Sequence, residues 1–97
     1  MEIRVLLPEG QLPVTIAEVV SAVAKQGLEA RHDKQNWGDW IVISGKETVI
    51  SIESARGLAS SAIIEGAEGE DEVSDTLLAA FRKLGWDGED EDGRYRL

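Results

Sequence analysis

The sequence predicts a single α+β domain in which two helices pack on one face of an antiparallel sheet. The chain has 97 residues, 42% of them hydrophobic and 30% charged, which suffices for one core without metal or disulfide support. Two segments carry an apolar stripe at helical spacing and are followed by a glycine. Two β-branched runs flank a Gly-Lys pair, as in a β-hairpin.

The hairpin is the most regular stretch of the chain. We expect Gly45-Lys46 to form a two-residue type II′ turn, because glycine suits its first central position. In that register Val42 faces Val49 and Ile41 faces Ile50. Since side chains alternate between the two faces of a strand, one face of the hairpin is almost entirely aliphatic and the other is mixed. The aliphatic face is expected to form the core.

Local signals place the first strand and the first helix. Residues 2–7 alternate between apolar and polar side chains and end at Pro8, which predicts a strand. Thr15 is the expected N-cap of the helix that follows, and Glu18 completes a capping box with it. Gly27 suits the position directly after the end of this helix.

The second helix is predicted from its apolar stripe, formed by Val73, Leu77, Ala80, Phe81 and Leu84. Either Asp71 or Ser74 is expected to cap its start. Gly85 follows its end and places Trp86 against Phe81. An acidic loop over residues 87–92 then leads to a short strand at the C-terminus.

Two segments leave alternatives open. Residues 29–38 are either a surface loop or a twisted strand that enters the hairpin after a bulge near Gly38. Residues 54–69 contain a turn at Arg56-Gly57 and either a short strand or a short helix over 62–65.

The element order is therefore strand, helix, hairpin, helix, strand. This order resembles the ferredoxin-like βαββαβ plait, whose two helices lie on one face of an antiparallel sheet. The resemblance concerns topology and implies no activity. It implies that the other sheet face is open.

The charge distribution limits the classes of partner. The net charge is −9, and residues 65–92 hold eleven acidic side chains against two basic ones. Such a field repels phosphate backbones, so we expect no nucleic-acid partner. No segment approaches the roughly 20 apolar residues of a membrane span, and residues 1–5 lack the layout of a signal peptide. With no cysteine, the chain fits a reducing compartment, and we expect a soluble, cytoplasmic protein.

The leading functional hypothesis is a non-enzymatic binding or protein-interaction module that uses the open sheet face. Its partner is another protein or a second copy of the chain in a homodimer, because apolar patches on a surface mark such contacts. In a regular strand Trp37 would point to the face opposite Trp40; alternatively both are packed, with Trp37 capping the core. The contact residues expected on the open face are Arg4, Leu6, Trp40, Val42 and Val49.

Two other functions compete with this one. The first is an acidic protein that neutralises a basic partner, as an immunity protein or a nucleic-acid mimic does. Its contact residues would be Glu70, Asp71, Glu72, Glu89, Asp90, Glu91 and Asp92. The second is a small enzyme in which the only histidine, His32, acts as a general base beside Asp39.

No cofactor or metal is expected. One histidine without any cysteine does not make a zinc site. The glycine spacing in residues 87–93 does not fit an EF-hand loop, so this acidic run is interpreted as solvated charge.

Overall fold

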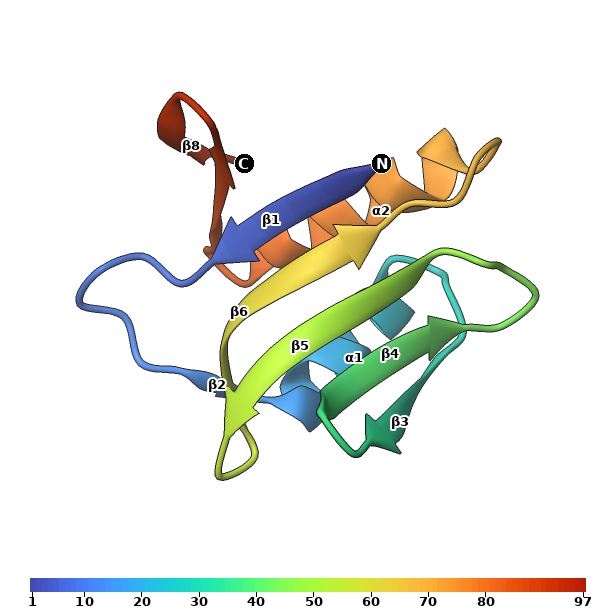
Figure 1. The fold of residues 1–97 in the computed structure, drawn as a ribbon, viewed down its shortest axis with the longest axis horizontal. Helices are drawn as coiled ribbons and strands as arrows, with labels where there is room; N and C mark the ends of the chain where they lie inside the picture. The colour runs from blue at the N-terminus through green and yellow to red at the C-terminus, as the bar shows by residue number, and fades with distance from the viewer.

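The computed structural model describes the whole chain, Met1–Leu97. Two helices form one layer, and an antiparallel sheet forms the other (Figure 1). The sheet order is β3-β4-β5-β6-β1-β7-β8, and the short β2 pairs with β6. The strands are β1 (Glu2–Leu6), β2 (Val14–Thr15), β3 (Ala30–Gln35), β4 (Gly38–Ile43), β5 (Val49–Ala55), β6 (Leu58–Glu65), β7 (Asp87–Asp90) and β8 (Gly93–Arg96); the helices are α1 (Ile16–Lys25) and α2 (Asp71–Lys83).

The α+β class is confirmed, but the strand order differs from that of the ferredoxin-like plait. The plait would place the strand that follows the hairpin turn directly beside β1. Instead β6 lies between β5 and β1 and pairs with both. The reason is the segment after residue 54, where β5 continues to a tight turn at Arg56-Gly57. Both residues have positive φ, 56° and 78°, as a type I′ hairpin requires.

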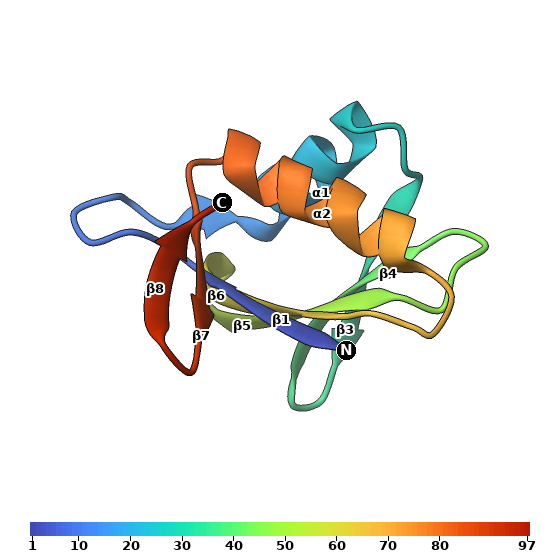
Figure 2. The same cartoon turned by 90° about the horizontal axis from the view of Figure 1, so that it is seen from above.

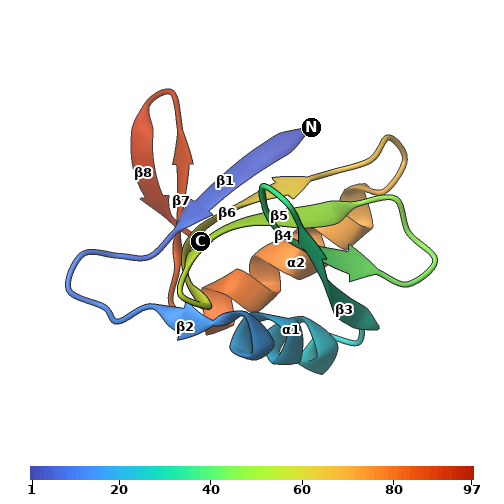
Figure 3. The same ribbon diagram turned by 60° about the horizontal axis from the view of Figure 1, so that its bottom comes forward.

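Both helices cross the same face of the sheet. Because successive strands are antiparallel, β1 runs parallel to β3 and β6 runs parallel to β7. Helix α1 connects the first pair, and α2 connects the second pair across β1. Figure 2 shows both helices on one side and no element covering the other. Figure 3 shows the β7–β8 hairpin at one edge of the sheet and β3 at the other.

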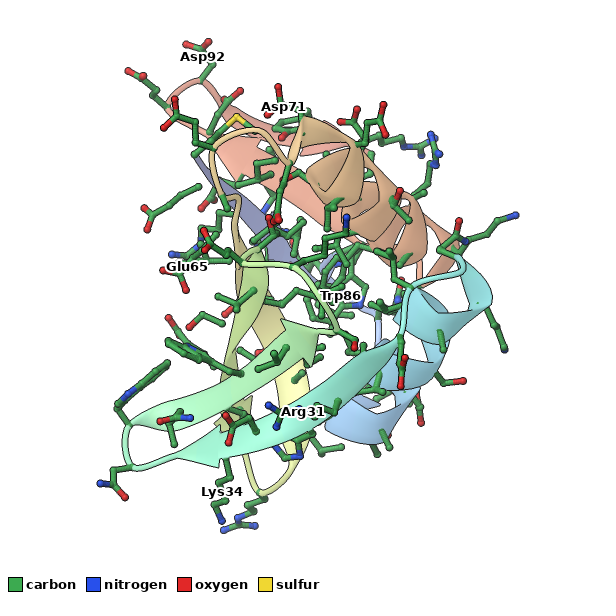
Figure 4. The ribbon with its side chains drawn as sticks, turned by 90° about the vertical axis from the view of Figure 1, so that its right-hand side faces the viewer. Arg31, Lys34, Glu65, Asp71, Trp86 and Asp92 are labelled. Atoms are coloured by element: carbon green, nitrogen blue, oxygen red, sulfur yellow. The ribbon has the colours of Figure 1, made fainter.

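The core follows the predicted alternation along β4 and β5. Ile41 and Ile50 are fully buried beneath the helices and lie opposite each other, whereas Val42 and Val49 are half-buried on the other face. The predicted register and face assignment are therefore confirmed. Beneath α2, Trp86 is 2% exposed (Figure 4).

The connection between β4 and β5 is longer than the predicted two-residue turn. The backbone N–H of Lys46 donates to the carbonyl of Ile43 at 3.1 Å, so the central residues of the turn are Ser44 and Gly45. Gly45 has a φ of 73° and is the second central residue, not the first. Strand β5 begins only at Val49, and the prediction of a type II′ turn at Gly45-Lys46 is wrong.

The helix ends agree with the glycine signals. Gly27 and Gly85 both have positive φ, 92° and 83°. After α2 the N–H of Trp86 donates to the carbonyl of Phe81 at 3.0 Å, as in a Schellman motif. The two rings then pack with centroids 5.0 Å apart, which confirms the predicted contact.

The start of α2 is different from the prediction. Its N-cap residue is Glu70, whose side chain makes no capping hydrogen bond. Asp71 is the first helical residue, and Ser74 is buried within the first turn. Neither of them is therefore the N-cap. The Glu70 carboxylate makes no capping bond because it is turned toward the β4–β5 connection.

The structure also decides between the alternatives for residues 29–38 and 54–69. Residues 29–38 contain strand β3, which joins β4 through a two-residue turn with Gln35 opposite Gly38. The register is continuous there, so the bulge predicted near Gly38 is absent. Residues 62–65 belong to a strand.

Most of the acidic run 87–92 is not a loop, because Asp87–Asp90 pairs with both β1 and β8. Gly88 permits this pairing, since a Cβ atom there would clash with the ring of Tyr95.

Thr15→Ala is expected to destabilise the protein by about 0.5–2 kcal/mol. The Thr15 hydroxyl accepts a hydrogen bond from the backbone N–H of Glu18 at 3.1 Å, and the alanine variant leaves that donor without its partner. Denaturant unfolding of the variant measures the loss. Ser21→Ala, at an exposed position on the same helix, should change stability far less. Equal effects of the two substitutions would contradict the role of the cap.

Candidate functional site

The open face of the sheet carries a contiguous, mostly apolar group on β4, β5 and β6. Val42 lies directly opposite Val49. Trp40 lies opposite Ser51, and Ser51 lies opposite Ile63. Cross-strand partners share a face, and all five side chains are half-buried. We call this set, together with Trp37, the aromatic face.

Of the predicted contact residues, Trp40, Val42 and Val49 lie together, while Arg4 and Leu6 lie apart from them on β1. Leu6 is only 9% exposed and contributes little contact surface. Arg4 points to the open face opposite Ile63. Its guanidinium forms a surface ion pair with Glu89 at 3.2 Å.

Trp37 is the most exposed aromatic side chain. It occupies the turn between β3 and β4 and is 61% exposed. Its ring packs against the ring of Trp40 with a centroid distance of 5.4 Å and an interplanar angle of 69°. The two tryptophans therefore share one side, and neither the predicted opposite placement nor a core-capping role of Trp37 is correct. Figure 2 shows this hairpin tip projecting from the sheet on the side away from the helices.

Asp33 lies beside this aromatic pair, and it was not among the predicted contact residues. It is directly opposite Trp40 in the β3–β4 register, so its carboxylate lies on the same face. The side chain is half-buried and forms no hydrogen bond or ion pair within the chain. The alternation of side chains along β3 would have placed Asp33 on this face. From the sequence alone this segment is either a strand or a loop, so Asp33 was not assigned to a face.

The acidic residues of the second hypothesis divide into tied and free groups. Glu89 pairs with Arg4, Glu70 is bonded within the fold, and Asp90 accepts a hydrogen bond from the N–H of Asp92 at 2.9 Å. The others are exposed, and Figure 1 places the start of α2 and the tip of the β7–β8 hairpin on opposite sides of the molecule. The free residues are Asp71, Glu72, Glu91 and Asp92.

Glu70 connects the start of α2 to the β4–β5 connection. Its carboxylate accepts hydrogen bonds from the Thr48 hydroxyl at 2.7 Å, the Thr48 N–H at 2.9 Å and the Glu47 N–H at 3.2 Å. These bonds, those from Thr48 above all, lower the pKa of Glu70 because they favour the ionised form. Glu70 therefore links the start of α2 to the β4–β5 connection within the fold.

His32 and Asp39 come together, as the enzyme hypothesis requires. The Asp39 carboxylate is buried at 6% exposure and lies 2.6 Å from Nε2 of His32. It also accepts a hydrogen bond from the Ser54 hydroxyl at 2.6 Å. The bond from Ser54, followed by that from His32, lowers the pKa of Asp39. The carboxylate thus stands between the Ser54 hydroxyl and the imidazole, and the His32 ring forms no hydrogen bond with a hydroxyl group.

The surface depressions lie away from His32, Asp39 and the two tryptophans, although Val42 lines one of about 410 Å³. The largest, about 530 Å³, lies between the C-terminal ends of α1 and α2, and none is lined by His32, Asp39, Trp37 or Trp40. No group of three or more His, Asp or Glu side chains is placed to hold a metal ion. Neither helix combines the length and the apolar character needed to cross a bilayer.

In comparisons with known proteins, no family model, curated protein or solved structure matches this chain.

Proposed function

We propose that this chain is a non-enzymatic protein-interaction module and that the aromatic face is its contact surface. The observation that carries the proposal is the Trp37–Trp40 pair, which keeps Trp37 61% exposed on the side of the sheet that no helix covers. Tryptophan buries a large area and is enriched at the centres of protein interfaces. Val42, Val49 and Ile63 extend the apolar surface beside it.

A second candidate function uses the free acidic residues. Asp71 and Glu72 are exposed at the start of α2, and the net charge of −9 would accelerate association with a basic target. In this case the contact surface would be either the start of α2 or the tip of the β7–β8 hairpin, which lie on opposite sides of the molecule (Figure 1). The protein would act as a partner-neutralising protein of the immunity-protein or nucleic-acid-mimic kind.

Affinity capture from an extract of the host, followed by titration of the purified partner, tests the first function. Wild type and the control Ala24→Glu, which places a charge at an exposed position of α1, should bind the partner equally. Val42→Glu should abolish binding, because it puts a carboxylate in the centre of the contact. A partner that binds Val42→Glu normally but loses affinity for Glu72→Gln with Glu91→Gln would support the acidic surface instead.

An alternative partner is a second copy of the chain, although its net charge of −9 opposes self-association. If the aromatic face pairs with itself about a twofold axis, sedimentation or light scattering should show a dimer whose population rises with protein concentration. Trp40→Lys should then give a folded monomer, because the dimer would bury its charge without a counterion. A wild type that stays monomeric at the highest accessible concentration would exclude the homodimer.

A further inference from the structure

We infer that Trp37, Trp40 and Asp33 form a seat for a cationic side chain, an arginine or lysine presented by a basic protein partner. This inference rests on the proposed function of the aromatic face and specifies the chemistry of the group that binds there. We call these three residues the cation seat.

The two indole rings supply the first part of the seat. A ring centroid distance of 5.4 Å and an interplanar angle of 69° make an edge-to-face contact. In this arrangement one ring presents its edge to the other and leaves the exposed Trp37 ring open to solvent. An ammonium or guanidinium group is attracted to the face of an indole ring, and arginine also stacks on it.

The Asp33 carboxylate supplies the second part. It lies on the same face as Trp40, directly across from it. The Arg4–Glu89 ion pair and the His32–Asp39 contact lie elsewhere. Arg31 shares the face of Asp33 but lies opposite Val42 and forms no ion pair with it. Asp33 is thus a half-buried carboxylate without a partner beside an exposed aromatic pair.

These two parts together determine the chemistry of the partner. Any protein surface that covers the Trp37–Trp40 pair also removes water from Asp33, because the carboxylate is the cross-strand neighbour of Trp40. A purely apolar surface would leave that charge buried without compensation, which is strongly unfavourable. A surface that brings an arginine or lysine to this position compensates the carboxylate and contacts the indole face at once.

The charge of the whole protein favours the same partner. The net charge is −9, and the open face also carries the carboxylate of Glu53. Such a surface attracts a basic protein at long range and repels an acidic one. Asp33 would then fix the position of one cationic side chain within the contact.

The indole N–H signals of the intact protein provide a direct test in an NMR titration. The probes are N-acetyl-arginine amide and N-acetyl-lysine amide, with N-acetyl-citrulline amide as the neutral analogue of the arginine probe. The charged probes should shift the Trp37 and Trp40 signals in a saturable, salt-sensitive manner. Trp86, which is 2% exposed, should not respond and serves as the internal control.

Two substitutions make the test specific. Asp33→Asn should weaken binding of the charged probes about two- to fivefold, the factor expected for one solvent-screened ion pair. Glu65→Gln removes a half-buried carboxylate from the same face but away from Trp40 and should leave binding unchanged. Equal shifts with the citrulline probe, no response of Trp37 and Trp40, or unchanged affinity in Asp33→Asn would each overturn the cation seat.

The failure of the seat is distinguishable from the failure of the proposed function. If Val42→Glu does not bind the partner but the tryptophan signals do not shift with the charged probes, the aromatic face is supported as the contact surface and the cation seat is wrong. If the probes bind as expected but Val42→Glu keeps its partner, the seat is supported and the wider contact surface is wrong.

Discussion

Ile64→Ala should destabilise the protein by about 2–5 kcal/mol, as truncation of a fully buried aliphatic side chain does, while Ile63→Ala should cost distinctly less. The two residues are neighbours in β6 and lose the same atoms. Ile64 is 0% exposed beneath the helices, whereas Ile63 is half-buried on the open face. The comparison therefore isolates the effect of the face.

Chemical denaturation of both variants, monitored by tryptophan fluorescence, measures the difference in the free energy of unfolding. Ile50→Ala, whose side chain is also 0% exposed, should behave like Ile64→Ala. If Ile63→Ala proves as damaging as Ile64→Ala, the open face is covered in solution. The dimer arrangement would then be favoured over an isolated module.

The elements with strong periodicity were predictable because their local and tertiary preferences agree. The alternation of β4 and β5 gave the correct register and the correct core face, since a shift by one residue would have exposed Ile41 and Ile50. Thr15 and Gly85 gave helix boundaries for a similar reason. A hydroxyl that accepts a helix N–H, and a glycine that adopts positive φ, have few other roles at those positions.

The strand order was not predictable because it depends on a segment with weak periodicity. Residues 58–65 carry small side chains, Ala59, Ser60, Ser61 and Ala62 among them, and their strand is held by neighbours on both sides. Small residues suit a central strand beneath two helices, but in the sequence they resemble a loop. The prediction of the β4–β5 turn was wrong for another long-range reason. Glu70 accepts hydrogen bonds from the backbone N–H groups of Glu47 and Thr48, and these bonds hold the connection in a longer form.

The candidate site was predicted in part for the same reasons. Trp40, Val42 and Val49 were placed correctly because they belong to the hairpin with clear alternation. Ile63 was missed because residues 62–65 were left between a strand and a helix, and Asp33 was missed because β3 was left between a strand and a loop. Trp37 was misplaced because it lies in a turn, where the alternation of strand side chains does not apply.

The polar cluster of Ser54, Asp39 and His32 near the tip of the β3–β4 hairpin gives the second large effect on stability. Ser54→Ala should destabilise the protein by about 1–3 kcal/mol at neutral pH, because it removes a hydrogen-bond donor from a buried carboxylate. The Ser54 hydroxyl lies 2.6 Å from Oδ2 of Asp39, and Asp39 is 6% exposed. Ser51 lies three residues earlier on the same strand, faces the other side of the sheet and forms no side-chain hydrogen bond. Ser51→Ala should therefore reduce the free energy of unfolding much less.

The same cluster predicts how acid changes this loss. Hydrogen bonds from Ser54 and then His32 lower the pKa of Asp39 below its ordinary value of 3.8. A carboxyl group whose pKa is lower in the folded state stabilises the fold above its unfolded pKa, and this contribution disappears as the pH falls through the folded pKa. The difference in unfolding free energy between wild type and Ser54→Ala should therefore be largest at neutral pH and shrink as the pH falls below 3.8. Denaturant unfolding of both proteins across this range measures the difference. A gap that stays constant down to the acid transition would show that the Ser54 hydroxyl does not act through the ionised form of Asp39.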